Sequence, residues 1–410
     1  MLAFRIFFVT LPKISKQDCS KMKKLIWALC TLVAFMGCHS DNEVETKKGR
    51  AVMVYMAADN NLGSGGYDKA DLREMMAGSK DLAPYNKLYA FCDFNRSSTP
   101  PFIVEFVNGD TIRRVTFDAS AQSSDPSVLH QSISWMVANA GNVLDYGLVL
   151  WGHSTGWEFR QSNAASRAYG ADYDTNGYTW WMNIPSMAQA LNGLPHLRFI
   201  FADCCVFQCV ETAYELRHAT DYIIGSPAEI PNDGAPYDMV VPALFARGDR
   251  FYESIVDNYF QQKSGGYDLP LSVIKTSELE QLAAVTHATM QKFMPTEGYV
   301  QADTLVYYFD RNMYDMNDFI RSHAEEDVYQ TWKTYFFDKA VVYKTYSDRW
   351  MTDGGTPHVN FRDFQMTEER YGGMSMFLRV NPTTPFLRSL NNDINKMEWY
   401  EAAHLSDFGW

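Results

Sequence analysis

The sequence predicts an α/β fold in which a mostly parallel sheet is covered by helices on both faces. From residue 51 onward, short apolar runs of strand length alternate with runs of helical spacing. Two of the strand-like runs, 146–151 and 199–203, are apolar at nearly every position, as strands buried on both faces are. Strands joined through helices pair in parallel by right-handed crossovers, which produces these layers.

The first half of this pattern predicts regular strands and helices and one hairpin. Asn108-Gly109 lies between two β-prone runs and is a strong hairpin signal. Leu72, Met75 and Met76 share one side of a helical run. We expect, in order, a strand at 51–57, a turn or helix start at 59–63, a helix at 67–77, a strand at 87–92, hairpin strands at 102–107 and 111–117, a helix at 127–140 and a strand at 146–151.

The second half is less regular. Residues 156–178 are rich in glycine, serine, asparagine and aspartate and predict a long mobile loop. Beyond about residue 240 the sequence is helical and aromatic-rich, with a late strand at 374–380 that joins either the main sheet or a small second one. The elements expected between these regions are a helix at 184–191, a strand at 199–203, a helix at about 210–217 and a strand at 221–225.

The N-terminal segment predicts export and lipid anchoring. Residues 1–37 combine an upstream stretch with a signal-like segment that begins at Met22 and continues through two lysines and the apolar run 25–36. Gly37-Cys38 resembles a bacterial lipoprotein processing site, so we expect Cys38 to carry the lipid and 38–50 to be a linker. The apolar run is too short to span a membrane as a helix. Acidic residues after Cys38 resemble a surface-export signal, which implies the cell envelope and its outer-membrane surface.

Charge and cysteine content exclude several classes of protein. The net charge is −13, and no basic patch with interleaved aromatic residues is present, so we expect no nucleic-acid partner. The acidic balance would suit cationic substrates, although solubility is the simpler explanation and the preferred one. The cysteines lack the spacing of a disulfide framework or a zinc site, so no metal is required. We expect a monomer.

Cys205 and His153 are the candidate catalytic pair. Cys204-Cys205 follows the strand at 199–203, and His153 follows the strand at 146–151, 52 residues upstream of Cys205. The carboxyl ends of parallel strands form the crevice in which ligands bind. A cysteine nucleophile with a histidine base is therefore expected there. The alternative for Cys205 is an inert, buried packing residue.

Four motifs carry a resemblance to the clostripain family of cysteine peptidases. The motifs are Tyr55–Leu62, Leu150–His153 with Gly156-Trp157, Asp203–Cys205 with Glu211–Tyr214, and Gly372–Phe377. The resemblance runs from about residue 51 to 380. It implies a caspase-like α/β/α sandwich with a mostly parallel central sheet, a catalytic core at 51–240 and a helical, aromatic-rich C-terminal subdomain at 241–410 packed on the core.

The resemblance also selects the nucleophile. The family has an acid two positions before the cysteine and a Glu-Thr-Ala-Tyr-like helix six positions after it. Asp203 and Glu211 satisfy both offsets for Cys205, whereas Cys204 would satisfy neither. Cys204 stands where the family has alanine, and Ser154 stands where the family usually has glycine.

The mechanism expected from these residues is acyl transfer through a Cys–His dyad. His153 is the general base and then the acid, and the backbone N–H groups of Ser154 and Cys205 stabilise the oxyanion. A helix starting directly after Cys205 would favour the thiolate through its N-terminal amides. The sequence shows no third group that orients His153, and the turn at Asp59-Asn60 is interpreted as structural or as a wall of the site.

Substrate preference and regulation are implied by the resemblance. Relatives cleave after arginine, sometimes lysine, which makes Asp203 the expected pocket acid and Asp233 or Glu229 a second one. The alternatives are a structural aspartate at 203 and a solvated turn at 233. The resemblance also implies self-cleavage in the loop predicted at 156–178, for which Arg167 is the candidate cleavage site. Some relatives depend on calcium, so calcium is an implied cofactor although no EF-hand loop is present.

The sequence therefore predicts a lipid-anchored cysteine endopeptidase that cleaves peptides or proteins after arginine or lysine. The alternative is a catalytically inactive surface lipoprotein of the same fold that binds peptides or proteins. A purely structural surface protein is a third option, which would not need Cys205 and His153 at strand ends.

Overall fold

The computed structural model describes residues 48–95, 99–159, 168–173, 179–260, 269–352 and 359–410. The chain divides into Met1–Lys47 and a compact unit at Lys48–Trp410, and the text below concerns the second unit. The predicted signal peptide, Cys38 and Arg167 lie outside the described residues. None of the described helices is both long and apolar enough to cross a membrane.

The main sheet is mostly parallel at its centre and antiparallel at both edges. In the described part of the chain it has nine strands in the order β12-β10-β9-β8-β5-β1-β2-β3-β4. The neighbours β9, β8, β5, β1 and β2 pair in parallel, and the outer strands pair antiparallel. Its strands are β1 (Arg50–Ala58), β2 (Lys87–Phe94), β3 (Phe102–Val107), β4 (Asp110–Thr116), β5 (Asp145–Trp151), β8 (Phe199–Asp203), β9 (Tyr222–Gly225), β10 (Leu271–Lys275) and β12 (Val341–Thr345).

Strand β1 shows why this sheet needs helices on both faces. Its residues are all buried, with Met53 and Tyr55 in the core on one face and Val54 and Met56 in the core on the other. Full burial of one large apolar side chain contributes about 1.5–3 kcal/mol, so neither face can be left in water. The predicted α/β/α sandwich is confirmed.

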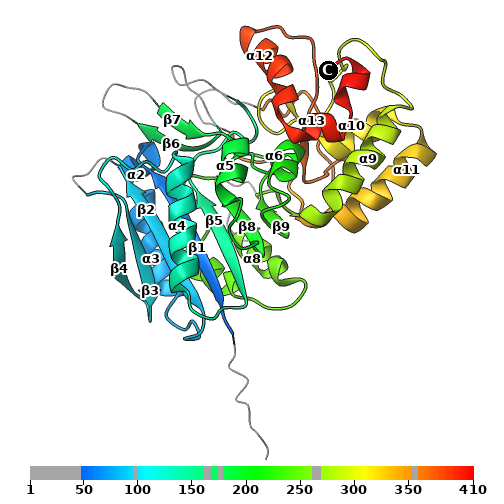
Figure 1. Cartoon of the computed structure of the whole chain (residues 1–410). Helices are drawn as coiled ribbons and strands as arrows, with labels where there is room; N and C mark the ends of the chain where they lie inside the picture. Colours follow the sequence, from blue (N-terminus) through cyan, green and yellow to red (C-terminus); the bar gives the residue numbers. More distant parts are fainter. Residues whose placement is uncertain (1–47, 96–98, 160–167, 174–178, 261–268, 353–358) are drawn as a thin grey trace, which may run out of the picture. The chain divides into compact units, whose positions relative to one another are not determined.

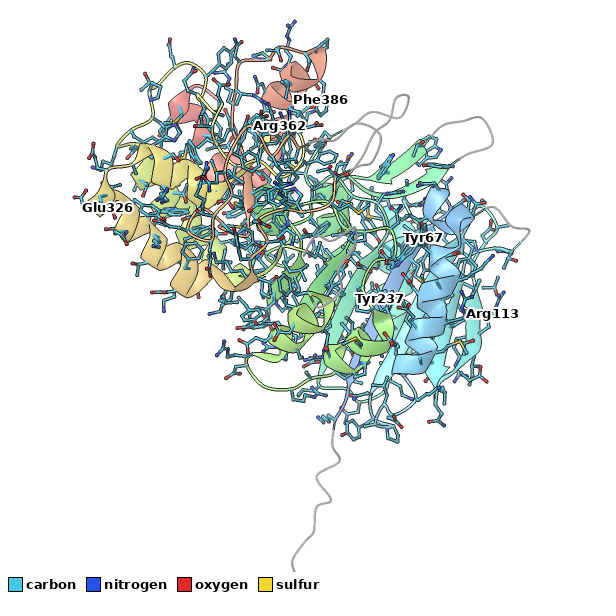
Figure 2. The ribbon with its side chains drawn as sticks, turned by 180° about the vertical axis from the view of Figure 1, so that it is seen from behind. Tyr67, Arg113, Tyr237, Glu326, Arg362 and Phe386 are labelled. Carbon is cyan, nitrogen blue, oxygen red and sulfur yellow. The ribbon has the colours of Figure 1, made fainter. Side chains whose placement is uncertain are left out.

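The two helical layers come from different parts of the chain. One face is covered by α4 (Pro126–Asn139), α5 (Ile184–Leu191) and α6 (Val210–Glu215), and the other by α3 (Tyr67–Gly78), α7 (Tyr237–Leu244) and α8 (Phe251–Phe260) (Figure 1). Figure 2 shows this second face from behind, with Tyr67 on α3, Tyr237 on α7 and Arg113 on the edge strand β4. Short α2 (Asn61–Gly65) follows β1 directly.

The C-terminal part is helical and aromatic-rich, as predicted. Strands β10 and β12 belong to the main sheet, so the sheet extends past the division predicted at residue 240. The late strand joins a small second sheet, because β13 (Ser375–Phe377) pairs with β11 (Met313–Asp315). The helices of this part are α9 (Leu279–Met290), α10 (Met316–His323), α11 (Glu326–Tyr335), α12 (Pro385–Asp393) and α13 (Glu398–Ala402).

One loop prediction is wrong. Within the range 156–178 the structure has a strand, β6 (Tyr169–Tyr173), which pairs antiparallel with β7 (Thr179–Met182). Glycine and aspartate in β6 hide the strand in the sequence, because both residues are depleted in strands. Asp172 is nevertheless fully buried, since its carboxylate accepts hydrogen bonds from the Ser123 hydroxyl at 2.6 Å and the Ser124 amide at 2.6 Å.

Candidate active site

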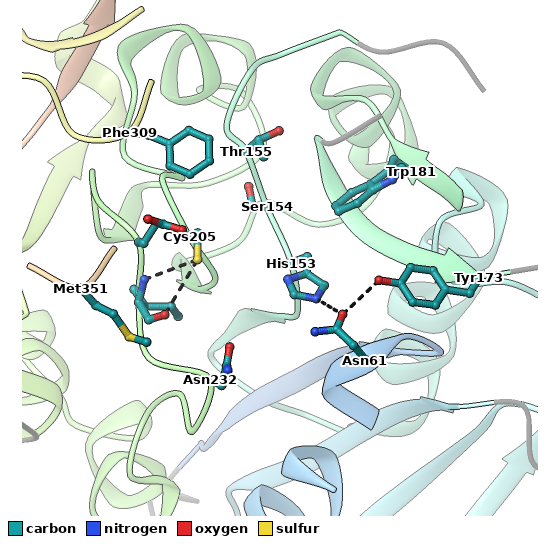
Figure 3. Close-up of a pocket in the computed structure, with 12 residues that line it drawn as sticks. Asn61, His153, Ser154, Thr155, Tyr173, Trp181, Cys205, Asn232, Phe309 and Met351 are labelled. Carbon is teal, nitrogen blue, oxygen red and sulfur yellow. Dashed lines mark hydrogen bonds between the residues drawn. The ribbon is translucent and has the colours of Figure 1, made fainter. Parts of the chain in front are cut away.

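The sheet brings Cys205 and His153 to one edge. Strands β5 and β8 are neighbours, and Trp151 pairs with Asp203. Cys205 and His153 each lie two residues beyond that pair, at the carboxyl ends where parallel strands form a ligand crevice. Both side chains are half-buried and line a cavity of about 360 Å³ (Figure 3).

A strained turn follows Cys205. Val206 has φ +48°, a conformation that is a genuine outlier for a β-branched residue. Such backbone strain costs on the order of 1–3 kcal/mol and persists only where surrounding contacts hold it. Here the Val206 side chain is fully buried, and its amide donates to the carbonyl of Ala228 at 2.9 Å. The turn therefore fixes where the thiol leaves the strand.

The Cys205 sulfur contacts a backbone amide. The N–H of Ile230 donates to Cys205 Sγ at an N–S distance of 3.4 Å. A hydrogen bond to the charged form of a group favours that form, so this amide favours the thiolate. The helix expected at about 210–217 is confirmed as α6, but it begins at Val210, five residues after Cys205, so its first turn does not follow the thiol directly. Ile230 lies 25 residues away in sequence, and no sequence signal pointed to it.

The imidazole of His153 contacts side chains from two other elements. His153 Nε2 lies 2.7 Å from Asn61 Oδ1, and the Tyr173 hydroxyl donates to the same oxygen at 3.1 Å (Figure 3). Trp181 lies near the imidazole, with ring centroids 6.3 Å apart. Asn61 was missed by sequence reasoning. Its position in an Asn-Asn pair after a strand is the available signal, but such a pair is also typical of a turn.

Burial distinguishes Cys205, which is half-buried, from the buried cysteines Cys204 and Cys209. Cys204 is fully buried in the core, and desolvation raises the pKa of its thiol well above the usual value. The pKa of Cys209 is raised to about 12 for the same reason. A thiolate at either position is unfavourable near neutral pH. These contrasts support Cys205 as nucleophile, which stays a prediction.

Serine replaces the family's glycine at position 154 without backbone strain. The left-handed conformations in this segment belong to Gly152, with φ +145°, and Gly156, with φ +66°, and not to Ser154. The Ser154 hydroxyl accepts a hydrogen bond from the Gly156 amide at 3.1 Å. Ser154 lines the larger cavity, and the predicted oxyanion role of its backbone N–H stays untested.

Asp203 lies close to the candidate pair Cys205 and His153. It lines a second, smaller cavity of about 20 Å³ together with Cys205 and His153. Its carboxylate accepts hydrogen bonds from the hydroxyls of Tyr259 at 2.7 Å and Tyr237 at 2.8 Å. Burial raises the pKa of Asp203, and these hydrogen bonds oppose the shift.

A second carboxyl group lies close to Asp203. The pKa of Asp71 is raised to about 9, mainly by burial and then by the charge of Asp203. The Trp151 indole N–H donates to Asp71 at 2.6 Å. Of the other predicted pocket acids, Glu229 lines the larger cavity, whereas Asp233 is exposed and lines neither of these two cavities.

The site shows no cluster of typical metal ligands among the described residues. Within the described ranges, no group of three or more histidine, cysteine, aspartate or glutamate side chains is placed to hold a metal ion. The carboxylate oxygens of buried Asp172 accept hydrogen bonds from Ser123 and Ser124. Calcium dependence, which nothing in the described residues tests, stays a prediction.

Comparison with known proteins supports a peptidase site. The model of the clostripain family matches residues 54–408. A secreted C11 cysteine protease from Bacteroides thetaiotaomicron, solved with an irreversible peptide inhibitor, is 28% identical, with a TM-score of 0.71 over 87% of this chain and 98% of that one. An inactive zymogen C11 protease from Parabacteroides distasonis is 25% identical, with a TM-score of 0.67 over 87% and 99%. Among curated proteins, none matches the chain.

Proposed function

Because the chain belongs to the clostripain family of cysteine peptidases, we propose that it is an endopeptidase that cleaves after arginine or lysine through Cys205 and His153. The observation that carries this proposal is the shared cavity: thiol and imidazole line it together, and the buried Asp203 lies beneath both. Peptide substrates fit a family in which a relative was solved with a peptide inhibitor.

The proposed reaction has two steps. Cys205 Sγ attacks the scissile carbonyl carbon while His153 takes the thiol proton, and the carbonyl electrons move to oxygen, where the amides of Ser154 and Cys205 donate. His153 then gives its proton to the leaving amine as the C–N bond breaks. Water hydrolyses the remaining thioester with His153 as base, which restores the free thiol.

The proposed preference for a basic residue rests on charge. Asp203 and Glu229 are carboxyl groups at the two cavities, and Asp71 lies behind Asp203. A guanidinium group pairs strongly with a carboxylate when water is excluded. A buried carboxyl group with a raised pKa ionises more readily when a cation arrives, so substrate charge and pocket charge stabilise each other. Asp233 remains a further candidate on the exposed loop.

Export, anchoring and activation concern residues 1–47 and 160–167, which lie outside the described ranges, so these proposals rest on the sequence and on the relatives. We propose a lipid on Cys38 and self-cleavage after Arg167. One relative is a secreted protease and another is an inactive zymogen, which supports export and an inactive precursor in this family. Metabolic lipid labelling of Cys38→Ala and N-terminal sequencing of the purified protein test the two proposals.

The first test is an assay of residues 39–410 against short peptides that end in arginine, lysine or aspartate. Cys205→Ala is expected to abolish cleavage after arginine or lysine, and Cys204→Ala, the matched control, is expected to retain it. Loss of cleavage only in Cys204→Ala would identify Cys204, and not Cys205, as the nucleophile. If no cleavage occurs in reducing buffer, with or without calcium and after trial activation, the inactive peptide-binding lipoprotein becomes the better reading.

A further inference from the structure

The contact between His153 and Asn61 has no part in a simple dyad. An amide oxygen only accepts hydrogen bonds, so the proton on this side of the imidazole is on His153 Nε2. In the neutral ring, Nδ1 is then the basic nitrogen. Figure 3 shows this second nitrogen on the side of the ring toward Cys205. The contact therefore selects the tautomer that can accept the thiol proton.

Asn61 is held in place by the segment around it. The amide of Tyr173 donates to the carbonyl of Asp59 at 2.9 Å, and Asn60 Nδ2 donates to the carbonyl of Ala171 at 2.8 Å. The two residues directly before Asn61 are thus hydrogen-bonded to strand β6, which fixes the start of α2. The Tyr173 hydroxyl then fixes the Asn61 amide oxygen directly.

Strand β6 also holds the backbone of His153. The amide of Gly170 donates to the carbonyl of His153 at 2.9 Å, and Ser154 forms an isolated bridge with Tyr169. One strand thus holds the histidine twice: at its backbone through Gly170, and at its imidazole through Tyr173 and Asn61. Rotation of the ring away from Cys205 would break the Asn61 contact.

We propose that Asn61 is a positioning residue for His153 and that Tyr173 holds the Asn61 amide in turn. When the imidazole takes the Cys205 proton on Nδ1, the Asn61 oxygen remains an acceptor for Nε2–H and stabilises the imidazolium. The proton is passed on to the leaving amine, and Asn61 itself gains or loses none. This inference rests on the proposed catalytic role of Cys205 and His153.

Other ionisable groups also face this site. Glu229 lines the same cavity as His153, Asp203 lines the smaller one, and Asp59 adjoins the Asn60-Asn61 pair. The test therefore compares variants at position 61 with one another, which leaves these groups unchanged.

The first measurement is the steady-state kinetics of Asn61→Ala and Tyr173→Phe. Asn61→Ala should lower kcat about 10- to 100-fold with KM nearly unchanged, since positioned proton transfer contributes about 10²- to 10⁴-fold. Tyr173→Phe should lower kcat several-fold. Trp180→Phe is the matched control, because this aromatic residue of β7 is exposed and does not line the larger cavity. Wild-type kcat in Asn61→Ala would overturn the proposal.

The second measurement uses Asn61→Asp, which keeps the shape and the acceptor oxygen but adds a charge. A carboxylate facing the ring favours the imidazolium, so the limb of the pH profile that reports loss of its proton should move up by about one pH unit or more. Superimposable limbs for Asn61→Asp and wild type would contradict a direct role. This variant decides the question even if Asn61→Ala fails to fold.

The same pH profiles can be measured without a substrate. The rate at which iodoacetamide alkylates Cys205 reports the thiolate and its imidazole partner. Mass spectrometry on residues 39–410 follows this rate. The signal belongs to Cys205 because Cys92, Cys204 and Cys209 are buried. Absence of peptide cleavage would count against the proposed function alone. An alkylation profile that is shifted in Asn61→Asp would still support the positioning role, and an unshifted one would reject it.

Discussion

Cys205 and His153 occupy equivalent strand ends, but different kinds of contact hold them. The thiol leaves β8 through a strained turn at Val206 and receives a backbone N–H from Ile230. The imidazole is held through side chains, since its Nε2 faces Asn61 and Asn61 accepts from Tyr173. The two halves of the site therefore depend on the sequence in different ways.

This difference predicts where substitution is tolerated. A backbone amide is present whatever the side chain, so the position of the thiol is set by the path of the chain through Val206 and Ile230. The position of the imidazole depends on the identity of Asn61 and of Tyr173. Side-chain changes should act mainly on catalysis on the His153 side and mainly on stability on the Cys205 side.

The largest expected effect is loss of the imidazole itself. His153→Ala should lower kcat/KM for an arginine peptide by about 10²- to 10⁴-fold, because general acid–base catalysis contributes about that much. Steady-state kinetics against that peptide provides the measurement. His130→Ala, on helix α4, is the matched control and should keep wild-type kinetics. Equal losses in both variants would show that the effect is not specific to the site.

The next effect concerns Asp203, the proposed pocket acid. Asp203→Asn should lower kcat/KM for arginine and lysine peptides about 10- to 100-fold, since a hydrogen bond to a charged group contributes about 1.5–3 kcal/mol. Glu229→Gln should have a smaller effect if Asp203 is the main acid. The reverse ranking, measured with the same peptides, would assign the preference to Glu229.

A third effect is the pH dependence of stability from Asp71. Its folded pKa, about 9, is above its unfolded value, so the stability that protonation provides is full at low pH and is lost as pH rises toward 9. The free energy of unfolding of Asp71→Asn, relative to that of wild type, should therefore rise by at least about 1 kcal/mol between pH 5 and pH 8. Denaturant titrations at both pH values measure it. Exposed Asp81→Asn should show no such gain.

The smallest expected effect tests the strained turn. At an ordinary buried position alanine is more stable than glycine, but at φ +48° the order should reverse. Val206→Gly should therefore be more stable than Val206→Ala by about 1 kcal/mol, although both lose the buried valine. Thermal unfolding of the two variants is the measurement. The usual order, with alanine above glycine, would show that the turn relaxes without cost.

The sequence predicted most of the layer structure because apolar periodicity is a local signal. The runs at β1, β5 and β8 are apolar at nearly every position, and burial on both faces leaves few other arrangements for them. Strand β6 was missed because Gly170 and Asp172 look like loop residues. Its pairing with β7 and the burial of Asp172 against two serines are contacts between distant segments.

The sequence by itself determined the fold class, the family resemblance and the two strand ends where chemistry is expected. Local spacing is enough for these, since each strand ends where its apolar run ends. Tertiary structure alone decided what surrounds the thiol and the imidazole. In the sequence, Ile230 lies 25 residues from Cys205, and Asn61 and Tyr173 lie 92 and 20 residues from His153. A hydrogen bond depends on the distance between two atoms in space, and sequence separation carries almost no information about that distance.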